Sequence, residues 1–356
     1  MVPSGFATDT GPAALRGRLF RECNVDVLIG FDNRSGVFPI HRSTKFLLLT
    51  ATHGRPTERT RCRFGLTDPA VLDYLSDEIA RDPLQALPVT VTPAVLRRIS
   101  GGDLAIPDFR CAEDLRLTER MAAAHRPLGD PAGWGARFGR ELNATDHRRY
   151  FTSTGGGLPV LEGKHLSPYC VDVSGPTLRI PSRTAAQLLG PVGGFRRARL
   201  AYRDVASATN RLTLIAAIVP KDCVTTHTVF CLRPPMRASD QRVLCALLNS
   251  FVANFLVRMR VSTHVTTAVL HTIPVPRPET DSALHADIDK RVQARGRAPE
   301  RAAALDAELQ ALTACAYGLT AAEYEHVLGT FPLVPASQRE HALETFRQLA
   351  PARCSR

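Results

Sequence analysis

The stretch Val25–Phe31, with the sequence VDVLIGF, decides the fold predicted for the N-terminal part of this chain. Its unbroken apolar run is typical of a buried strand, and the polar residues Asn33–Gly36 after it predict a turn. A second apolar run, Thr44–Thr52 (TKFLLLTAT), predicts another strand, and Thr10–Phe20 predicts a short helix before both. Apolar strands of this kind suit the interior of a sheet that is covered on both faces. Residues 1–60 are therefore predicted to be α/β.

The middle of the chain changes character twice. Residues 61–136 are interrupted by prolines and have a mixed pattern with one predicted helix, Ala112–His125, so we interpret them as a connector. The pattern then becomes strand-rich, with turn residues between the runs. The predicted strands are Arg199–Val205, Leu212–Val219 and Thr226–Leu232.

Helices are predicted within and after this strand-rich stretch. One begins near Ser239, which can cap it, and its apolar residues recur at spacings of three and four: Leu244, Leu247, Leu248, Phe251, Phe255 and Met259. Further on, Ala302–Tyr317 predicts a helix that ends at Gly318, and Thr320–Glu323 and Ser337–Glu340 each have the pattern of a capping box. We therefore expect a mixed α+β domain over residues 137–278 and a helical region over residues 279–356.

The positive charge of the chain is concentrated in one region. Arg137–Arg277 contains nineteen Lys/Arg and seven Asp/Glu, a net of +12, in a chain whose net charge is +11. Arginine outnumbers lysine there by seventeen to two, and arginine can fork onto phosphates and guanine edges. This region is predicted to bind double-stranded DNA. The alternative is a surface in which arginine replaces lysine because the genome is rich in G and C.

Composition excludes several other classes of protein. With 356 residues, 44% of them apolar, the chain can form two or three units that each bury a core. No apolar run reaches the roughly 18 residues that span a bilayer, and MVPSGFATD lacks the features of a signal peptide. We expect a cytoplasmic protein without membrane contact. The nine cysteines include no CxxC pair, so no metal site is predicted.

The segment Ser35–Leu49 (SGVFPIHRSTKFLLL) contains the one catalytic candidate, Phe38. On pattern alone, Phe38 is an ordinary core phenylalanine at the start of a strand. However, VPSGFATD, FDNRSGVFP and TKFLLL resemble the late motifs of the Eco57I-like, TaqI-related N6-adenine DNA methyltransferases. The resemblance implies that residues 1–60 are the last strands of a Rossmann-like methyltransferase sheet. It also implies that Phe38 stacks on the target adenine after this base has been flipped from the duplex.

The resemblance extends over nearly the whole chain. Five phrases are similar, in the same order, to the target-recognition domain of that family: WGARFGRELNATDHRRYF, LPVLEGKHL, YRDVASATNRLTLIAAIVP, LNSFVANFLVRMRVSTHV and IPVP. AAALDAELQALTACAYGL, followed by TFPLV, is similar to its C-terminal helical region. Residues 137–278 are thus expected to recognise DNA, with contacts from Lys164, Arg203, Asn210, Arg211, Arg258 and Arg260.

Structural alternatives exist for several of these residues. Arg203 and Asp204 could form a solvated pair on a surface hairpin. Arg258 and Arg260 suit the C-terminus of a helix, where the dipole favours positive charge. His264, in a Thr/Val-rich strand, is interpreted as structural rather than catalytic.

Two motifs of the family are absent from this sequence. It has neither the glycine-rich turn that binds S-adenosylmethionine nor the Asn-Pro-Pro-Tyr tetrapeptide. Pro234-Pro235 stands in RPPM, which lacks the amide and aromatic groups, and Gly155–Gly157 is a lone glycine triplet in a polar loop. We expect this chain alone not to bind S-adenosylmethionine. A missing N-terminal catalytic half or a separate methylase subunit would supply both motifs, and Met1 would be a misassigned start, a frameshift product or the start of a split subunit.

Together these features predict the DNA-recognition and adenine-stacking part of a site-specific, S-adenosylmethionine-dependent adenine-N6 DNA methyltransferase of a restriction-modification system. The alternative is a non-enzymatic specificity subunit, or a decayed fragment, that works with a separate methylase. A nuclease is a third possibility, because Pro107-Asp108 and Glu162–Lys164 resemble a PD…ExK cluster. The long gap between the two parts disfavours it.

Overall fold

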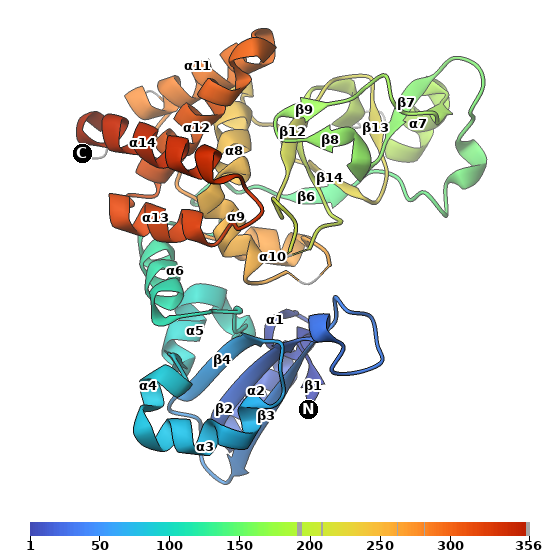
Figure 1. The fold of residues 1–356 in the computed structure, drawn as a ribbon. Helices are drawn as coiled ribbons and strands as arrows, with labels where there is room; N and C mark the ends of the chain where they lie inside the picture. The colour runs from blue at the N-terminus through green and yellow to red at the C-terminus, as the bar shows by residue number, and fades with distance from the viewer. Residues whose placement is uncertain (191–193, 208, 262, 281, 354–356) are drawn as a thin grey trace. The chain divides into compact units, whose positions relative to one another are not determined.

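The computed structural model describes residues 1–356 except 191–193, 208, 262, 281 and 354–356. The chain folds into two compact units (Figure 1). Unit 1 comprises Met1–Ala124 and Met259–Ser262, and unit 2 comprises His125–Arg258 and Thr263–Arg356. Both mix helices with small sheets. Within the described part of the chain, no helix has the length and apolarity that crossing a membrane requires.

Unit 1 is built on a five-stranded sheet in the order β1-β3-β2-β4-β5. Its strands are β1 (Val2–Pro3), β2 (Cys23–Asp32), β3 (Lys45–His53), β4 (Thr60–Leu66) and β5 (Val89–Val91). β2 is antiparallel to β3 and parallel to β4, while β5 is antiparallel to β4. The central pair β2 and β3 confirms the two strands predicted from the apolar runs.

Six α-helices complete the described part of unit 1: α1 (Gly5–Thr8), α2 (Ala13–Glu22), α3 (Val71–Arg81), α4 (Pro83–Ala86), α5 (Pro93–Ser100) and α6 (Ala112–Ala124). Val71 and Leu75 of α3 join the core formed by Phe31 of β2 and Phe46 of β3, and α2 also packs against β2. The predicted helices over Thr10–Phe20 and Ala112–His125 correspond to α2 and α6. Most of the stretch interpreted as a connector therefore forms strands and helices of this unit.

The described residues of unit 2 form three small sheets. The largest has the antiparallel order β12-β11-β14-β6 and comprises β6 (Phe138–Arg140), β11 (Arg199–Arg203), β12 (Ala216–Val219) and β14 (Val229–Leu232). The second has the order β10-β7-β13, from β7 (Leu158–Leu161), β10 (Arg179–Ile180) and β13 (Val224–Thr225). The third pairs β8 (Leu166–Ser167) with β9 (Cys170–Val171), and α7 (Ser182–Leu189) follows β10. The three predicted strands are present but shorter than predicted.

The helix predicted from Ser239 onward is two helices, α8 (Ala238–Asn249) and α9 (Phe251–Arg258), with a break at Ser250. Ser239 makes no capping bond, because α8 already begins at the residue before it. Asn249 at the break donates to the carbonyl of Ala216 at 2.8 Å and accepts from its N–H at 3.0 Å. The break thus places an asparagine amide on the edge strand β12.

Helices form the C-terminal part of unit 2: α10 (Thr267–Thr272), α11 (Ala283–Arg297), α12 (Ala302–Ala316), α13 (Ala321–Gly329) and α14 (Ala336–Arg353). Gly318 after α12 has a φ of +65°, as predicted for a helix end. The capping box at Thr320 and Glu323 is confirmed by bonds of 3.3 and 2.8 Å. The one predicted at Ser337 is wrong, because Ser337 already lies inside α14.

Candidate nucleic-acid interface

The loop that carries Phe38 is organised by Asn33, which follows β2 and is fully buried. Its Oδ1 accepts from the N–H of Phe38 at 2.9 Å, and its Nδ2 donates to the carbonyls of Phe38 at 3.1 Å and Ile40 at 3.2 Å. Gly36 provides the left-handed turn at φ +75°. The sequence predicted this turn but not the role of Asn33, although an asparagine at a strand end commonly bonds to nearby backbone.

The ring of Phe38 is half-buried at the end of a row of three aromatic rings. It meets the ring of Phe46 edge-on, with 4.9 Å between centroids, and Phe46 stacks on Phe31 at 5.1 Å. Phe38 also packs against the apolar core of unit 1. One part of the ring therefore supports the fold, while another part stays accessible to a ligand.

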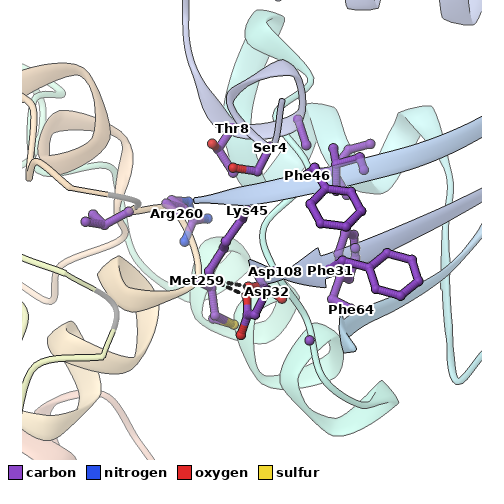
Figure 2. Close-up of a pocket in the computed structure, with 16 residues that line it drawn as sticks. Ser4, Thr8, Phe31, Asp32, Lys45, Phe46, Phe64, Asp108, Met259 and Arg260 are labelled. Atoms are coloured by element: carbon purple, nitrogen blue, oxygen red, sulfur yellow. Dashed lines mark hydrogen bonds and ion pairs between the residues drawn. The ribbon is translucent and has the colours of Figure 1, made fainter. Parts of the chain in front are cut away.

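A pocket of about 420 Å³ lies in unit 1 beside this aromatic row (Figure 2). Phe31, Phe46 and Phe64 line its apolar part. At its charged side, Lys45 Nζ lies 2.7 Å from Asp108 Oδ2 and 3.6 Å from Asp32 Oδ1. This lysine bridges two carboxylates that come from distant parts of the chain.

Arg260 also lines this pocket, together with its neighbours Met259 and Val261 (Figure 2). The segment is fixed there by a hydrogen bond of 2.7 Å from the N–H of Asp108 to the carbonyl of Met259. Arg260 is only 4% exposed, and burial lowers its pKa to about 10. Its guanidinium is charged at neutral pH but covered, which disagrees with the predicted DNA contact.

Asp108 and the Glu162–Lys164 segment, the two parts of the suggested nuclease cluster, each form ion pairs with residues of their own unit. Asp108, in unit 1, pairs with Lys45 and with Arg110 at 2.9 Å. In unit 2, Lys164 Nζ lies 2.8 Å from Glu162 Oε2. The side chain of Lys164 is 71% exposed, so it remains accessible as the predicted DNA contact.

Arg203 and Asp204, at the end of β11, do not form a solvated pair. Asp204 is buried, and its Oδ2 lies 3.0 Å from Nδ1 of His264, which agrees with the structural interpretation of this histidine. Arg203 is half-buried and packs across Gly163, where an added Cβ would come within 2.9 Å of the arginine Cγ. Burial lowers the pKa of Arg203, and its Nε has no hydrogen-bond partner among the described residues.

Arg258 at the end of α9 holds a loop rather than facing solvent. Its guanidinium donates to the carbonyls of Asn210 at 2.7 Å and Thr330 at 2.8 Å and lies 4.2 Å from the ring centroid of Phe331. Burial lowers its pKa to about 10. The same loop presents Arg211, which is exposed and donates to Gln338 at 2.5 Å, beside the half-buried Asn210. Arg258 is thus placed to support the two predicted contact residues.

Some acidic residues of the region Arg137–Arg277 pair with buried side chains of unit 2 and do not neutralise its exposed arginines. Glu141 and Arg199 form an ion pair of 2.6 Å whose side chains are 2% and 1% exposed. Asp240 lies 2.9 Å from His285. Eleven exposed basic residues of the region form no ion pair with a carboxylate of the described chain: Arg137, Arg140, Arg148, Arg149, Arg183, Arg196, Arg211, Lys221, Arg233, Arg237 and Arg277. The surface of this region is therefore strongly positive.

Two of these arginines meet at the edge strand β6. The guanidinium of Arg140 lies 5.0 Å from the ring centroid of Phe230, which itself stacks on Tyr202 at 5.4 Å. Arg233 donates to the carbonyl of Arg140, and Arg197 donates to the carbonyl of Arg233 at 2.6 Å. The sequence analysis did not single out these arginines, because their proximity depends on the pairing of β6 with β14.

Comparison with known proteins returns matches among solved structures alone. No protein-family model matches the sequence, and no curated protein matches it. The type IIL restriction-modification enzyme MmeI, solved in complex with DNA, is similar over 98% of this chain and 49% of its own, with 10% identity and a TM-score of 0.45. The type IIG restriction endonuclease BpuSI is similar over 99% of this chain and 47% of its own, with 11% identity and a TM-score of 0.38. The HsdS subunit from Thermoanaerobacter tengcongensis is similar over 80% of this chain and 57% of its own, with 13% identity and a TM-score of 0.25. The chain thus spans about half the length of the first two proteins.

Proposed function

We propose that this chain is the DNA-recognition part of a restriction-modification protein. The observation that carries the proposal is the set of exposed arginines between Arg137 and Arg277 that have no carboxylate partner in the described structure. Guanidinium groups of this kind neutralise phosphates and release counterions from DNA, which supplies much of the affinity. They also fork onto guanine edges.

We assign DNA contacts to Arg211, Arg140 and Arg233 of this set, and to Lys164, which also pairs with Glu162. All four are exposed. The guanidinium of Arg233 donates to the carbonyl of Arg140, and that of Arg140 lies over the ring of Phe230, which reduces the side-chain entropy that binding must overcome. Arg258 supports the Arg211 loop from behind and has a positioning role.

The finer proposal is that the protein methylates adenine at N6. The motifs that resemble adenine methyltransferases suggest that S-adenosylmethionine supplies the methyl group when it is bound by a catalytic half or a separate methylase subunit. The target base must leave the duplex to expose its amino group. Phe38, half-exposed and held by Asn33, is then the ring on which this base stacks.

A salt titration of DNA binding tests the recognition role. The logarithm of the affinity for duplex DNA is expected to fall linearly with the logarithm of salt, by about 0.9 per phosphate contacted. The Arg140→Ala/Arg211→Ala/Arg233→Ala variant is expected to lose about 2 to 3 from this slope. The matched control Lys290→Ala/Arg297→Ala/Arg301→Ala removes three exposed charges outside the basic region and is expected to keep it. Absence of binding at low salt, or binding that salt does not weaken, would overturn the proposal.

Calorimetry with S-adenosylmethionine tests the proposed division of labour. No binding is expected for this chain alone, because its sequence has neither the glycine-rich turn nor the tetrapeptide. Tight binding would contradict the assignment of the cofactor site to another polypeptide. It would leave the DNA-recognition role untouched.

A further inference from the structure

A second hollow in unit 1 lies at the other end of the sheet from the Phe38 loop. Its volume, including space open to solvent, is about 1250 Å³. β2 contributes Asn24 to this hollow and Asp32 to the pocket beside the aromatic row. These two residues are separated by about 26 Å along the strand, at roughly 3.3 Å per residue. The β2–β3 and β3–β4 connections likewise lie at opposite ends of these strands (Figure 1). We call this hollow the arginine groove.

Three arginines line the arginine groove. Arg55 and Arg59 belong to the connection between β3 and β4, and Arg61 belongs to β4, where it pairs with Thr90 of β5. Arg55 and Arg59 are exposed, and Arg61 is half-buried. None of the three forms an ion pair with a carboxylate of the described residues. They are therefore available to a ligand.

Arg63, the next arginine on β4, differs from these three because the fold engages its guanidinium. Arg63 pairs with Glu78 at 2.9 Å and donates to the carbonyl of Ala86 at 3.3 Å, so its charge is used by the fold. Of the two carboxylates that line the groove, Asp26 accepts hydrogen bonds from Asn24 and Thr52, and the other is Glu58. The groove thus combines three uncommitted cations with two acceptor groups.

We propose that the arginine groove binds the sugar-phosphate backbone of DNA, as a contact separate from the one on unit 2. Arginine binds phosphate oxygens through two parallel hydrogen bonds. The groove is open to solvent and has three guanidiniums, from a loop and a strand, so a chain of linked phosphates can enter where an enclosed cavity would admit a single anion. Phosphate oxygens accept hydrogen bonds, and the three arginines outnumber the carboxylates of Asp26 and Glu58 in the groove, so the groove favours an anion.

This inference rests on the proposed function in one respect, that DNA is the ligand. The test uses the full chain and a DNA duplex over a series of salt concentrations. Arg55→Ala/Arg59→Ala/Arg61→Ala is expected to lower the salt slope by up to about 2.7. The control Arg18→Ala/Arg21→Ala/Arg97→Ala removes the same charge from exposed positions of unit 1 and is expected to keep the wild-type slope.

A second variant tests the groove without changing a half-buried residue, so that a loss of binding cannot come from misfolding. Arg61 is half-buried, so Arg55→Ala/Arg59→Ala, in which both positions are exposed, is measured as well. Its slope is expected to fall by about 1.8, with an unchanged melting temperature.

Chemical modification gives a readout that does not depend on affinity. Phenylglyoxal, which reacts with arginine, is applied with and without the duplex, and the modified sites are identified by mass spectrometry. DNA is expected to protect Arg55, Arg59 and Arg61, and to leave Arg21 and Arg97 reactive. Equal protection by polyglutamate would overturn the proposal in favour of an acidic peptide.

The outcomes separate the two proposals. If the wild-type chain binds DNA and the groove variants keep its salt slope, the arginine groove is not a DNA contact and the proposed function stands. If the wild-type chain fails to bind DNA at any salt concentration, both proposals fail.

Discussion

Asn33 holds Phe38 by both of its backbone groups, accepting from its N–H at 2.9 Å and donating to its carbonyl at 3.1 Å. Because Asn33 is fully buried, Asn33→Ala leaves these groups without their partner. Phe38 is half-buried, so water can reach its freed groups in part, and each lost hydrogen bond costs about 0.5–1.5 kcal/mol. We therefore expect a loss of stability of about this size, measured by urea unfolding.

The variant Asn33→Asp tests which part of the amide matters. It keeps the acceptor for the N–H of Phe38 but removes the donor to the carbonyls of Phe38 and Ile40. We expect it to be destabilised as well. If both variants unfold at the wild-type urea concentration, the amide does not organise the loop.

Phe38→Ala separates a stacking role from a core role. The half-buried ring predicts a smaller loss of stability than the roughly 3–5 kcal/mol of a fully buried phenylalanine. Base stacking contributes on the order of 1–3 kcal/mol. With the catalytic partner restored, methylation by Phe38→Ala should therefore slow by about tenfold or more. Sequence preference should not change, because the proposed recognition surface is on unit 2.

Phe38→Trp is the matched variant, since any aromatic face can stack on a base. It is expected to keep much of the methylation rate. The readouts are melting temperature, DNA affinity and methylation rate, measured on both variants. A Phe38→Ala protein that is fully active, or that has lost its fold, would count against the stacking role.

The buried pair of Arg199 and Glu141 predicts a large effect from a single change. Arg199→Met leaves the carboxylate of Glu141 buried without its cation, which costs about 3–5 kcal/mol. The double variant Arg199→Met/Glu141→Leu removes both charges and is expected to be closer to wild type. For comparison, Arg18→Met breaks the exposed pair with Glu22 and should change the free energy of unfolding by less than about 1 kcal/mol. Urea denaturation of the three variants tests whether breaking the buried pair costs more free energy of unfolding than breaking the exposed pair.

The stability of unit 2 is expected to depend on the protonation of His271. Its Nε2 accepts from the N–H of Phe138 at 3.3 Å, which requires a neutral ring. Burial, followed by the charge of Arg137, lowers the pKa of His271 below its ordinary value of 6.5. As the pH falls below 6.5, the unfolded chain takes up this proton before the folded chain does. The stabilising contribution is therefore present above this pH and is lost as the pH falls through the folded pKa.

His271→Gln retains an acceptor without a charge that titrates in this range. It should unfold with a weaker pH dependence on the acidic side than wild type. The exposed His341 provides the control, because His341→Gln should leave the profile unchanged. An identical acid profile for His271→Gln and wild type would contradict the prediction.

Local patterns predicted the parts of the fold that local interactions stabilise. The apolar run of β2 and the capping box at Thr320 both appear where they were expected. The break at Ser250 is stabilised locally by a bond from the N–H of Ala253 to Ser250 Oγ at 3.0 Å. It is also stabilised by bonds between Asn249 and Ala216, a residue that strand pairing brings close, and this second contribution could not be predicted from a local pattern. The same limit applies to Arg258 and Arg260. They are two residues apart and similar in charge, but a sequence pattern contains no information on which groups surround each one.

The return of the chain to unit 1 has a consequence for its synthesis. Met259, whose carbonyl bonds to the N–H of Asp108, follows Ala124 by 135 residues. At translation rates of about 5–20 residues per second, it emerges from the ribosome roughly 7–27 s later. During that interval the strands of unit 1 can pair, but the side of the pocket formed by residues 259–261 is still missing. A sheet that pairs during this interval therefore lacks this segment until most of unit 2 has been translated.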